Sequence, residues 1–207
     1  MSITIIIIII TVGASVYALQ QREIMSKLIF NPYVVNVRKE WYRFFSHGLI
    51  HADYTHLAVN MWVLYIFGKN VEIMYRIEYG SLGTIAFILM YVSAIGIASI
   101  STYVKYKDNP GYNSLGASGA TSAVLYASIM LHPFGGIGLL FIPIYIPAVL
   151  FGVLYLVYSS YMGRRGGDNV NHEAHFYGAV FGFLYTLLLK PKLGLDFIDQ
   201  VKDYIGF

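Results

Sequence analysis

Four polar side chains stand in otherwise apolar segments of this 207-residue chain, where polar groups are costly and often functional. They are His56, Asn60, Ser118 and His175. A serine becomes a good nucleophile when a base removes its proton, and histidine is the usual base. The oxyanion formed by the attack needs fixed donors, which the Asn60 amide and free backbone N–H groups at a helix start provide. His56 precedes Asn60 by four residues and therefore shares its helix face.

The composition describes the environment of these four residues. Hydrophobic residues make up 57% of the chain and charged residues 12%, whereas a soluble globular domain carries roughly 25% charge. This balance excludes a soluble enzyme, a disordered segment and a basic nucleic-acid binder. Because there is no cysteine, a disulfide framework, a thiolate nucleophile and a zinc–thiolate site are excluded as well.

The apolar segments predict an all-α membrane protein, with residues 1–207 forming a single domain. A bilayer core about 30 Å thick needs roughly 20 apolar residues in a helix. A proline- and glycine-containing break at 132–136, followed by Pro143 and Pro147, divides the long uncharged stretch into two spans. The predicted spans are about 3–19, 55–75, 82–104, 115–131, 144–162 and 173–189.

The order of the spans predicts that the four polar residues meet. The second, fourth and sixth spans start on the same side of the membrane. At 1.5 Å per residue, each polar residue is expected roughly 5–10 Å inside the start of its span. Gly178 and Gly182, four residues apart after His175, form a close-packing face for a membrane helix. The small neighbours of Ser118, including Gly116 and Gly119, also favour close approach, so we expect these two helices to touch.

The segment 20–54 mixes basic and aromatic residues, a composition typical of a membrane interface. We interpret it as a structured first loop, in which Arg43 ties the chain together and His47 and His51 form structural hydrogen bonds. The first apolar run could alternatively be a cleaved signal peptide. It lacks a basic start and is long for such a segment, so we interpret it as a span.

These motifs resemble those of the rhomboid family of intramembrane serine proteases. The resemblance rests on Gly-Ala-Ser-Gly at 116–119, on Ala174-His175 followed by Gly178 and Gly182, and on His51 with His56 and Asn60 after it. It covers about residues 40–189. It implies a bundle of six transmembrane helices with a structured first loop, and hydrolysis of peptide bonds in or beside the transmembrane segments of substrates.

The resemblance also implies a role for each candidate residue. Ser118 would be the nucleophile and His175 the general base and then acid, while Asn60, His56 and the Ser118 backbone N–H would hold the oxyanion. No cofactor and no metal is implied, and the partners are transmembrane protein substrates and the lipid bilayer, with no nucleic acid. The residues expected to give structural support are Arg43, Gly116, Gly119, Gly178 and Gly182.

Two positions depart from the family pattern. The first loop reads Trp41-Tyr42-Arg43, with tyrosine where the family commonly has the tryptophan next to arginine. Four residues after the nucleophile the family often carries an aromatic ring that stacks on the base, whereas this chain has Ser122. Tyr126 and Tyr177 are the candidates to replace that ring.

The resemblance implies an integral multi-pass protein of the plasma (inner) membrane, with the site open to the extracytoplasmic side. The basic residues favour the opposite orientation, because nine of the 14 Lys and Arg residues fall on the side of the first, third and fifth loops. This argument uses the positive-inside rule, by which Lys and Arg gather in cytoplasmic loops. The rule concerns short unstructured loops, and the first loop is expected to fold. We therefore follow the resemblance.

Three other functions compete with proteolysis by a serine nucleophile. A zinc protease needs His-Glu-x-x-His, and the spacing from His172 to His175 is one residue short. A transporter predicts charges or broken helices at the midplane, whereas this polar cluster lies near one surface. A non-catalytic relative that binds membrane helices stays open as the alternative. His172 itself is expected to be an interfacial loop histidine, and Asp168 and Glu173 solvated charges.

Overall fold

The structure is a computed structural model that describes residues 2–139 and 142–206 and is mainly helical. Within these residues, each predicted span contains a helix, although two of these helices begin later than predicted. Their bounds are α1 Ile3–Gln20, α5 Tyr54–Val63, a π-helical turn Leu64–Gly68 leading into α6 Lys69–Tyr79, α7 Ser81–Ala98, α8 Ile100–Tyr106, α9 Ser118–Leu131, α10 Ala148–Arg165 and α11 His172–Leu189.

Two helices of the described residues are long and apolar enough, by length and composition, to cross a membrane. They are Ile3–Gln20 and the continuous stretch Ser81–Tyr106. A third is possible if His172–Leu189 and Lys192–Tyr204, which are bent by 111° at their junction, count as one span. Helix α9 is apolar but shorter. The chain is therefore a membrane protein by the character of its helices.

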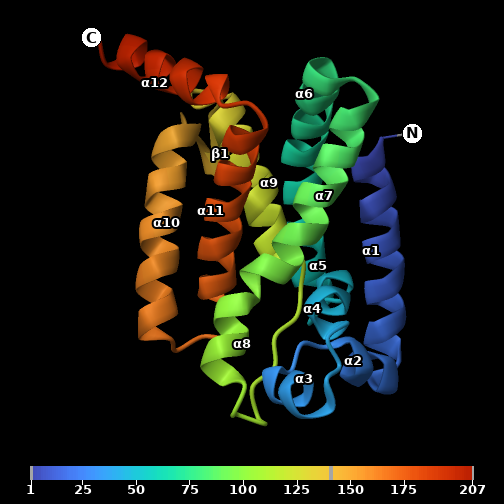
Figure 1. Ribbon diagram of the computed structural model, residues 1–207. Helices are drawn as coiled ribbons and strands as arrows, with labels where there is room; N and C mark the ends of the chain where they lie inside the picture. The colour runs from blue at the N-terminus through green and yellow to red at the C-terminus, as the bar shows by residue number, and fades with distance from the viewer. Residues whose placement is uncertain (1, 140–141, 207) are drawn as a thin grey trace.

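The remaining elements gather at the two ends of the bundle. Helices α2 (Arg22–Leu28), α3 (Pro32–Arg38) and α4 (Arg43–Ser46), with a 3-10 turn at His47–Leu49, lie at one end. Helix α12 (Lys192–Ile205) crosses the opposite end, above α10 and α11 (Figure 1). Helices α1 and α10 flank the bundle on opposite sides, and α9 lies between them (Figure 1).

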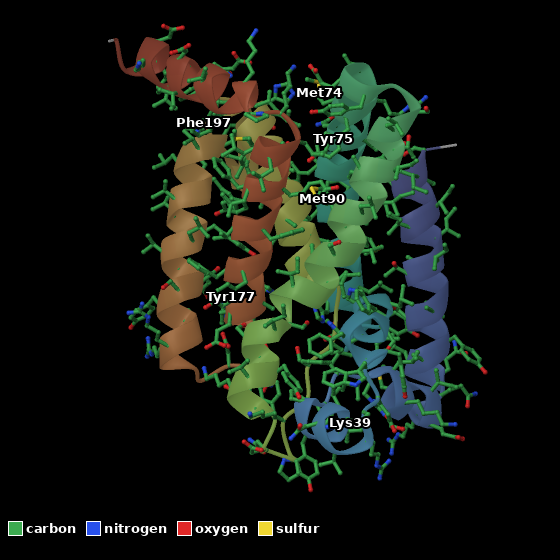
Figure 2. All side chains as sticks on the ribbon, in the orientation of Figure 1. Lys39, Met74, Tyr75, Met90, Tyr177 and Phe197 are labelled. Atoms are coloured by element: carbon green, nitrogen blue, oxygen red, sulfur yellow. The ribbon has the colours of Figure 1, made fainter. Side chains whose placement is uncertain are left out.

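Helix α9 is the central element of the bundle. Each residue from Gly119 to Leu131 is buried, and the helix packs against α7 and α11. Around it, Tyr75 of α6 donates to or accepts from the Thr186 hydroxyl of α11 at 2.6 Å and lies 3.4 Å from the Met90 sulfur of α7. Tyr75 and Met90 are both labelled in Figure 2. These contacts join α6, α7 and α11 around the central helix.

The start of α9 differs from the prediction. The predicted span began at 115, but the helix begins at Ser118. Gly116 has φ +110°, a conformation that no helix contains and that favours glycine. The chain after α8 instead runs back into the bundle in extended form before α9 begins (Figure 1). Ser118 is therefore the first residue of its helix rather than a residue one turn inside it.

The fifth predicted span also begins later than expected, at Ala148 rather than at about 144. The residues before it form a β-hairpin, with β1 (Gly136–Leu139) antiparallel to β2 (Ile142–Pro147). Ile137 pairs with Ile146 and Gly138 with Tyr145. The β-branched residues of β2 favour a strand, and prolines are tolerated in a strand that has a free edge.

Candidate active site

Helices α9 and α11 approach each other through glycines. A Cβ atom added to Gly178 would lie 2.1 Å from the carbonyl oxygen of Gly119. A Cβ atom added to Gly182 would lie 2.0 Å from the carbonyl oxygen of Ala123. Real side chains never come so close, so any larger residue would push the two helices apart. The glycines that predicted contact between these helices therefore lie at a very close backbone approach.

This packing brings Ser118 and His175 into the same neighbourhood. A Cβ atom on Gly119, the residue after Ser118, would lie 3.4 Å from the carbonyl oxygen of Ala174, the residue before His175. Both Ser118 and His175 are half-buried. The structure records no hydrogen bond between the Ser118 hydroxyl and the His175 ring. Catalytic hydrogen bonds are often long without a substrate and tighten when it binds.

The position of Ser118 at the start of α9 leaves backbone donors free around it. The first N–H groups of a helix have no partner within the helix, and the helix dipole favours negative charge there. Ser118 also lines a small cavity of about 10 Å³ together with His47, Ser99 and Asn171. A cavity of this size has room for about one water molecule.

The Asn60 side chain is fixed by two hydrogen bonds. Its Nδ2 donates to the carbonyl oxygen of His56 at 3.0 Å, and its Oδ1 accepts from the Thr121 hydroxyl at 3.0 Å. The Thr121 hydroxyl lies 3.1 Å from the carbonyl oxygen of Ser118. Thr121 therefore links Asn60 on α5 to the first turn of α9. One amide hydrogen of Asn60 stays available for another acceptor.

The His56 ring lies directly against the backbone before Ser118. A Cβ atom on Gly116 would stand 2.6 Å from His56 Cε1 and 2.9 Å from His56 Nε2. Glycine at 116 therefore serves two needs, a positive φ and space for an imidazole. Asp53 caps α5 by accepting from the His56 N–H at 2.8 Å, which fixes where this helix begins.

His51 holds the segment that leads into Ser118. Its Nε2 accepts the Ala117 N–H at 3.3 Å, so its Nδ1 carries the proton and donates to the Ser15 hydroxyl at 2.9 Å. The Ser15 hydroxyl, on α1, donates a hydrogen bond to the carbonyl oxygen of Leu49 at 2.9 Å. Burial lowers the pKa of His51 to about 3, which keeps the ring neutral as this arrangement requires. Sequence reasoning missed the contribution of α1.

His47 holds the neighbouring residue in a similar way. Its carbonyl oxygen accepts the Gly116 N–H at 3.0 Å, and its Nε2 lies 2.9 Å from the Ser99 hydroxyl. Ser99 also donates to the carbonyl oxygen of Ile95 at 3.0 Å. Burial lowers the pKa of His47 to about 4. The two histidines of the first loop are thus neutral hydrogen-bonding groups that fix the backbone at 116 and 117.

Arg43 lies away from Ser118, inside the first loop. Its Nε donates to Glu40 at 2.6 Å, and its guanidinium donates to the carbonyl oxygens of Ser26 at 2.9 Å and Ile29 at 2.7 Å. The Arg43 hydrogen bond lowers the pKa of Glu40. Arg43 is 6% exposed, so a charge this deeply placed needs these partners. It connects α2 to α4 within the loop.

His172 is not an interfacial loop histidine, so that expectation is wrong. It is the first residue of α11, is 5% exposed, and its ring meets the His175 ring edge-on with centroids 5.8 Å apart. Its Nε2 lies 3.0 Å from Asp168 Oδ2, and this hydrogen bond lowers the pKa of Asp168. Glu173 pairs with Lys105 at 2.5 Å. Of the two carboxylates expected to be solvated, Asp168 is thus hydrogen-bonded to His172 and Glu173 forms an ion pair with Lys105.

The ring that stacks on His175 is neither of the two tyrosines suggested by the sequence. Tyr155 of α10 stacks on His175, with centroids 6.2 Å apart and planes 16° apart. Tyr177, labelled in Figure 2, is 46% exposed and contacts Phe176 edge-on. Tyr126 lies against Tyr155 instead, at 6.0 Å. No spacing in the sequence relates Tyr155 to His175, so only the packing of α10 reveals it.

Asn171 is a further residue that sequence reasoning missed. Its Oδ1 accepts the Ala174 N–H at 3.1 Å, which caps α11. Its Nδ2 donates to Thr102 at 2.9 Å and to Ser114 at 3.2 Å. Asparagine directly before a helix is a capping signal that could have identified it. Within the described ranges, no group of three His, Asp or Glu side chains could hold a metal ion.

Comparisons with known proteins identify the family of this chain. The family model described as the Rhomboid domain matches residues 38–192. A relative named "Putative rhomboid protease YdcA" from Bacillus subtilis (strain 168) is 31% identical over 155 residues, which is 74% of this chain and 69% of the relative. "RHOMBOID-like protein 12, mitochondrial" from Arabidopsis thaliana is 30% identical over 138 residues, covering 62% of this chain.

A third relative is "Presenilin-associated rhomboid-like protein, mitochondrial" from Mus musculus, 31% identical over 137 residues and covering 65% of this chain. The matched regions span 40% of the Arabidopsis relative and 34% of the mouse relative, so this chain corresponds to less than half of each. The family model covers most of the chain, including every candidate site residue. The chain therefore belongs to the rhomboid family.

Proposed function

We propose that this chain is an intramembrane serine endopeptidase that hydrolyses peptide bonds in or near the transmembrane segments of membrane proteins. Ser118 is the proposed nucleophile and His175 the proposed general base and acid. The substrates are other membrane proteins reached through the lipid bilayer, and the reaction needs neither a cofactor nor a metal. The proposal includes a bundle of six membrane-crossing segments built on the helices described above.

One observation carries the proposal more than any other. The start of α9, where Ser118 lies, and the first turn of α11, where His175 lies, pack together through Gly119, Ala174 and Gly178. A hydroxyl and an imidazole thus come from two helices with hardly any space between their backbones. Tight backbone contact of this kind limits how far the two side chains can separate, which is what a nucleophile and its base require.

The proposed reaction has two steps. The Ser118 Oγ attacks the scissile carbonyl carbon while His175 takes the hydroxyl proton, and a tetrahedral oxyanion forms. The carbon–nitrogen bond then breaks, and His175 gives the proton to the leaving amine, which leaves an acyl ester on Ser118. In the second step His175 takes a proton from water while the water oxygen attacks the ester carbon, and a second tetrahedral oxyanion forms. The bond between that carbon and Ser118 Oγ then breaks, His175 returns the proton to Oγ, and the fragment with the new carboxyl end leaves.

The oxyanion is the second requirement of this chemistry. We propose that the backbone N–H of Ser118, the side-chain N–H of Asn60 and the His56 ring donate to it. Support comes from the fixed orientation of the Asn60 amide between His56 and Thr121, and from the contact between the His56 ring and Gly116. Donors fixed before the reaction stabilise developing charge without reorganising.

Location and orientation are also part of the proposal. We propose an integral protein of the plasma (inner) membrane whose site opens to the extracytoplasmic side. The chain has no cysteine, so single cysteines placed at Asn109, near the start of α9, and at Lys202, on α12, give background-free probes. In intact cells, a membrane-impermeant maleimide should label Asn109→Cys and spare Lys202→Cys. The reverse pattern would overturn the orientation.

The test of the function is covalent labelling of Ser118. Purified protein in detergent or in liposomes is treated with a fluorophosphonate, and the Ser118→Ala variant serves as the control. We expect the native chain to become labelled at Ser118 and to cleave a single-span substrate, and we expect the variant to do neither. Chelators should not change either result.

A native chain that folds and binds membrane helices, but is neither labelled nor active, would favour the alternative of a non-catalytic rhomboid-like protein. Loss of activity on chelation would contradict the serine mechanism.

A further inference from the structure

The ring that stacks on His175 belongs to α10 and not to α9, the helix that carries Ser118. Position 122, one turn after Ser118, carries a small hydroxyl side chain that is 2% exposed. The Ser122 hydroxyl lies 2.8 Å from the Tyr155 hydroxyl of α10. Ser122 therefore meets the tip of a ring whose face covers the base. Two residues of different helices together fill the space beside His175.

Tyr155 is fixed from several directions. Its ring stacks on His175 at 6.2 Å with planes 16° apart, within the range of favourable aromatic contacts. Phe151, one turn earlier on α10, stacks on it at 5.9 Å, and Tyr126 of α9 lies at 6.0 Å. With both its face and its hydroxyl held, Tyr155 has little freedom to rotate. A Tyr155 ring fixed in this way can restrain the orientation of the His175 imidazole.

We propose that Tyr155 is a positioning residue for the general base, and that Ser122 anchors it through the hydroxyl contact. This inference rests on the proposed function, because it assigns Tyr155 a role in the reaction of Ser118 and His175. The imidazole must present one nitrogen to the serine hydroxyl and later to the leaving amine. A stacked ring restricts rotation of the imidazole about its Cβ–Cγ bond and keeps that nitrogen directed at Ser118.

The arrangement also makes the geometry of the base depend on α10. This helix packs against α9, α11 and the hairpin at the flank of the bundle (Figure 1). A displacement of α10 would carry the Tyr155 ring away from His175, whereas a ring on α9 would move together with the nucleophile. The turnover of this protein should therefore be sensitive to contacts between α10 and α11 that leave Ser118 untouched.

The experiment compares four variants in one cleavage assay, with kcat and KM measured separately. Tyr155→Leu should lower kcat about 10- to 10²-fold, because a small misplacement of a catalytic group has effects of that size. KM and the midpoint of thermal unfolding should change little. Tyr155→Phe and Ser122→Ala keep a ring on His175 but lose the anchor, so each should lower kcat by less than about tenfold.

The fourth variant and a double variant supply the controls. Tyr161→Leu changes another tyrosine of α10, one that is 57% exposed, and should leave kcat unchanged. Tyr155→Phe combined with Ser122→Ala should be no worse than either single change, because both remove the same hydrogen bond. The labelling rate of Ser118 by fluorophosphonate should follow kcat across the series.

The outcomes separate this inference from the function on which it rests. If the native chain is labelled and active but Tyr155→Leu equals it in kcat, the positioning role is wrong and the proposed function stands. The same holds if Tyr155→Leu loses activity only in proportion to a lower unfolding midpoint, since that would indicate general packing. If the native chain is neither labelled nor active, both the function and the inference fail.

Discussion

On the first-loop side of the candidate site, directional hydrogen bonds fix a stretch of backbone, whereas on the α10 side stacked rings and one hydroxyl contact fix a side chain. The His47 carbonyl oxygen accepts from the Gly116 N–H, and the His51 ring accepts from the Ala117 N–H. On the other side, Tyr155 and His172 meet His175 through their rings. The proposed nucleophile and its proposed base are thus held by contacts of different kinds.

The difference follows from what each group must do. As the proposed nucleophile, Ser118 needs a fixed position and free backbone donors, and hydrogen bonds to the preceding residues fix a helix start without using those donors. As the proposed base, His175 must accept and release a proton while its ring keeps one orientation. Ring contacts restrain orientation without competing for the ring nitrogens, which hydrogen bonds would do. Each side therefore tolerates different substitutions.

The largest expected effect comes from removing the Ser118 hydroxyl or the His175 imidazole. Ser118→Ala and His175→Ala should each lower cleavage of a single-span substrate by at least about 10³-fold, because each removes a participant in bond making. Expression and the midpoint of thermal unfolding should stay close to native values. The double variant should be no slower than either single variant. Substantial cleavage by either single variant would exclude the proposed pair.

The next effect tests the hydrogen-bonded side. Asn60→Ala should lower kcat on the order of 10²-fold, as expected for loss of one oxyanion donor, with a smaller change in KM. Thr121→Val, which removes the hydroxyl that orients the Asn60 amide, should give a smaller loss in the same parameter. Equal rates for Asn60→Ala and the native chain would remove Asn60 from the oxyanion site.

A third prediction concerns stability on the same side. His51→Leu leaves the Ala117 N–H and the Ser15 hydroxyl without their partner, so it should lower the free energy of unfolding by about 1–3 kcal/mol. Ser15→Ala removes one of those contacts and should cost less. Denaturant titration in mild detergent measures both. A larger loss for Ser15→Ala than for His51→Leu would mean that α1, rather than His51, holds the segment.

The smallest effect belongs to the aromatic side. His172→Ala should lower kcat by less than about tenfold, well below the 10²- to 10⁴-fold contribution of a general base. His172 touches His175 only through its ring edge, while its Nε2 is bound to Asp168. Asp168→Asn should have an even smaller effect. Complete inactivity of a folded His172→Ala variant would instead assign His172 a direct part in proton transfer.

Several features of the site were accessible from residue types and spacing. Gly178 and Gly182 predicted the contact between α9 and α11, which the structure confirms, and polar residues in apolar spans led to the proposal that Ser118 acts with His175. The positions of the helices followed from the lengths of the apolar segments. The hairpin before α10 was missed, because short apolar runs with prolines do not distinguish a strand from a helix start.

What the sequence by itself determined was the family, the helical membrane architecture and which side chains could do the chemistry. These depend on hydrophobicity, on residue type and on local spacing, all of which are properties of the chain alone. The tertiary structure decided which ring covers His175, which helix supports His51 through Ser15, and where Ser118 stands at the start of α9. Those facts depend on contacts between residues far apart in the chain, such as Tyr155 and Ser122, and no local pattern encodes which distant helix will pack there.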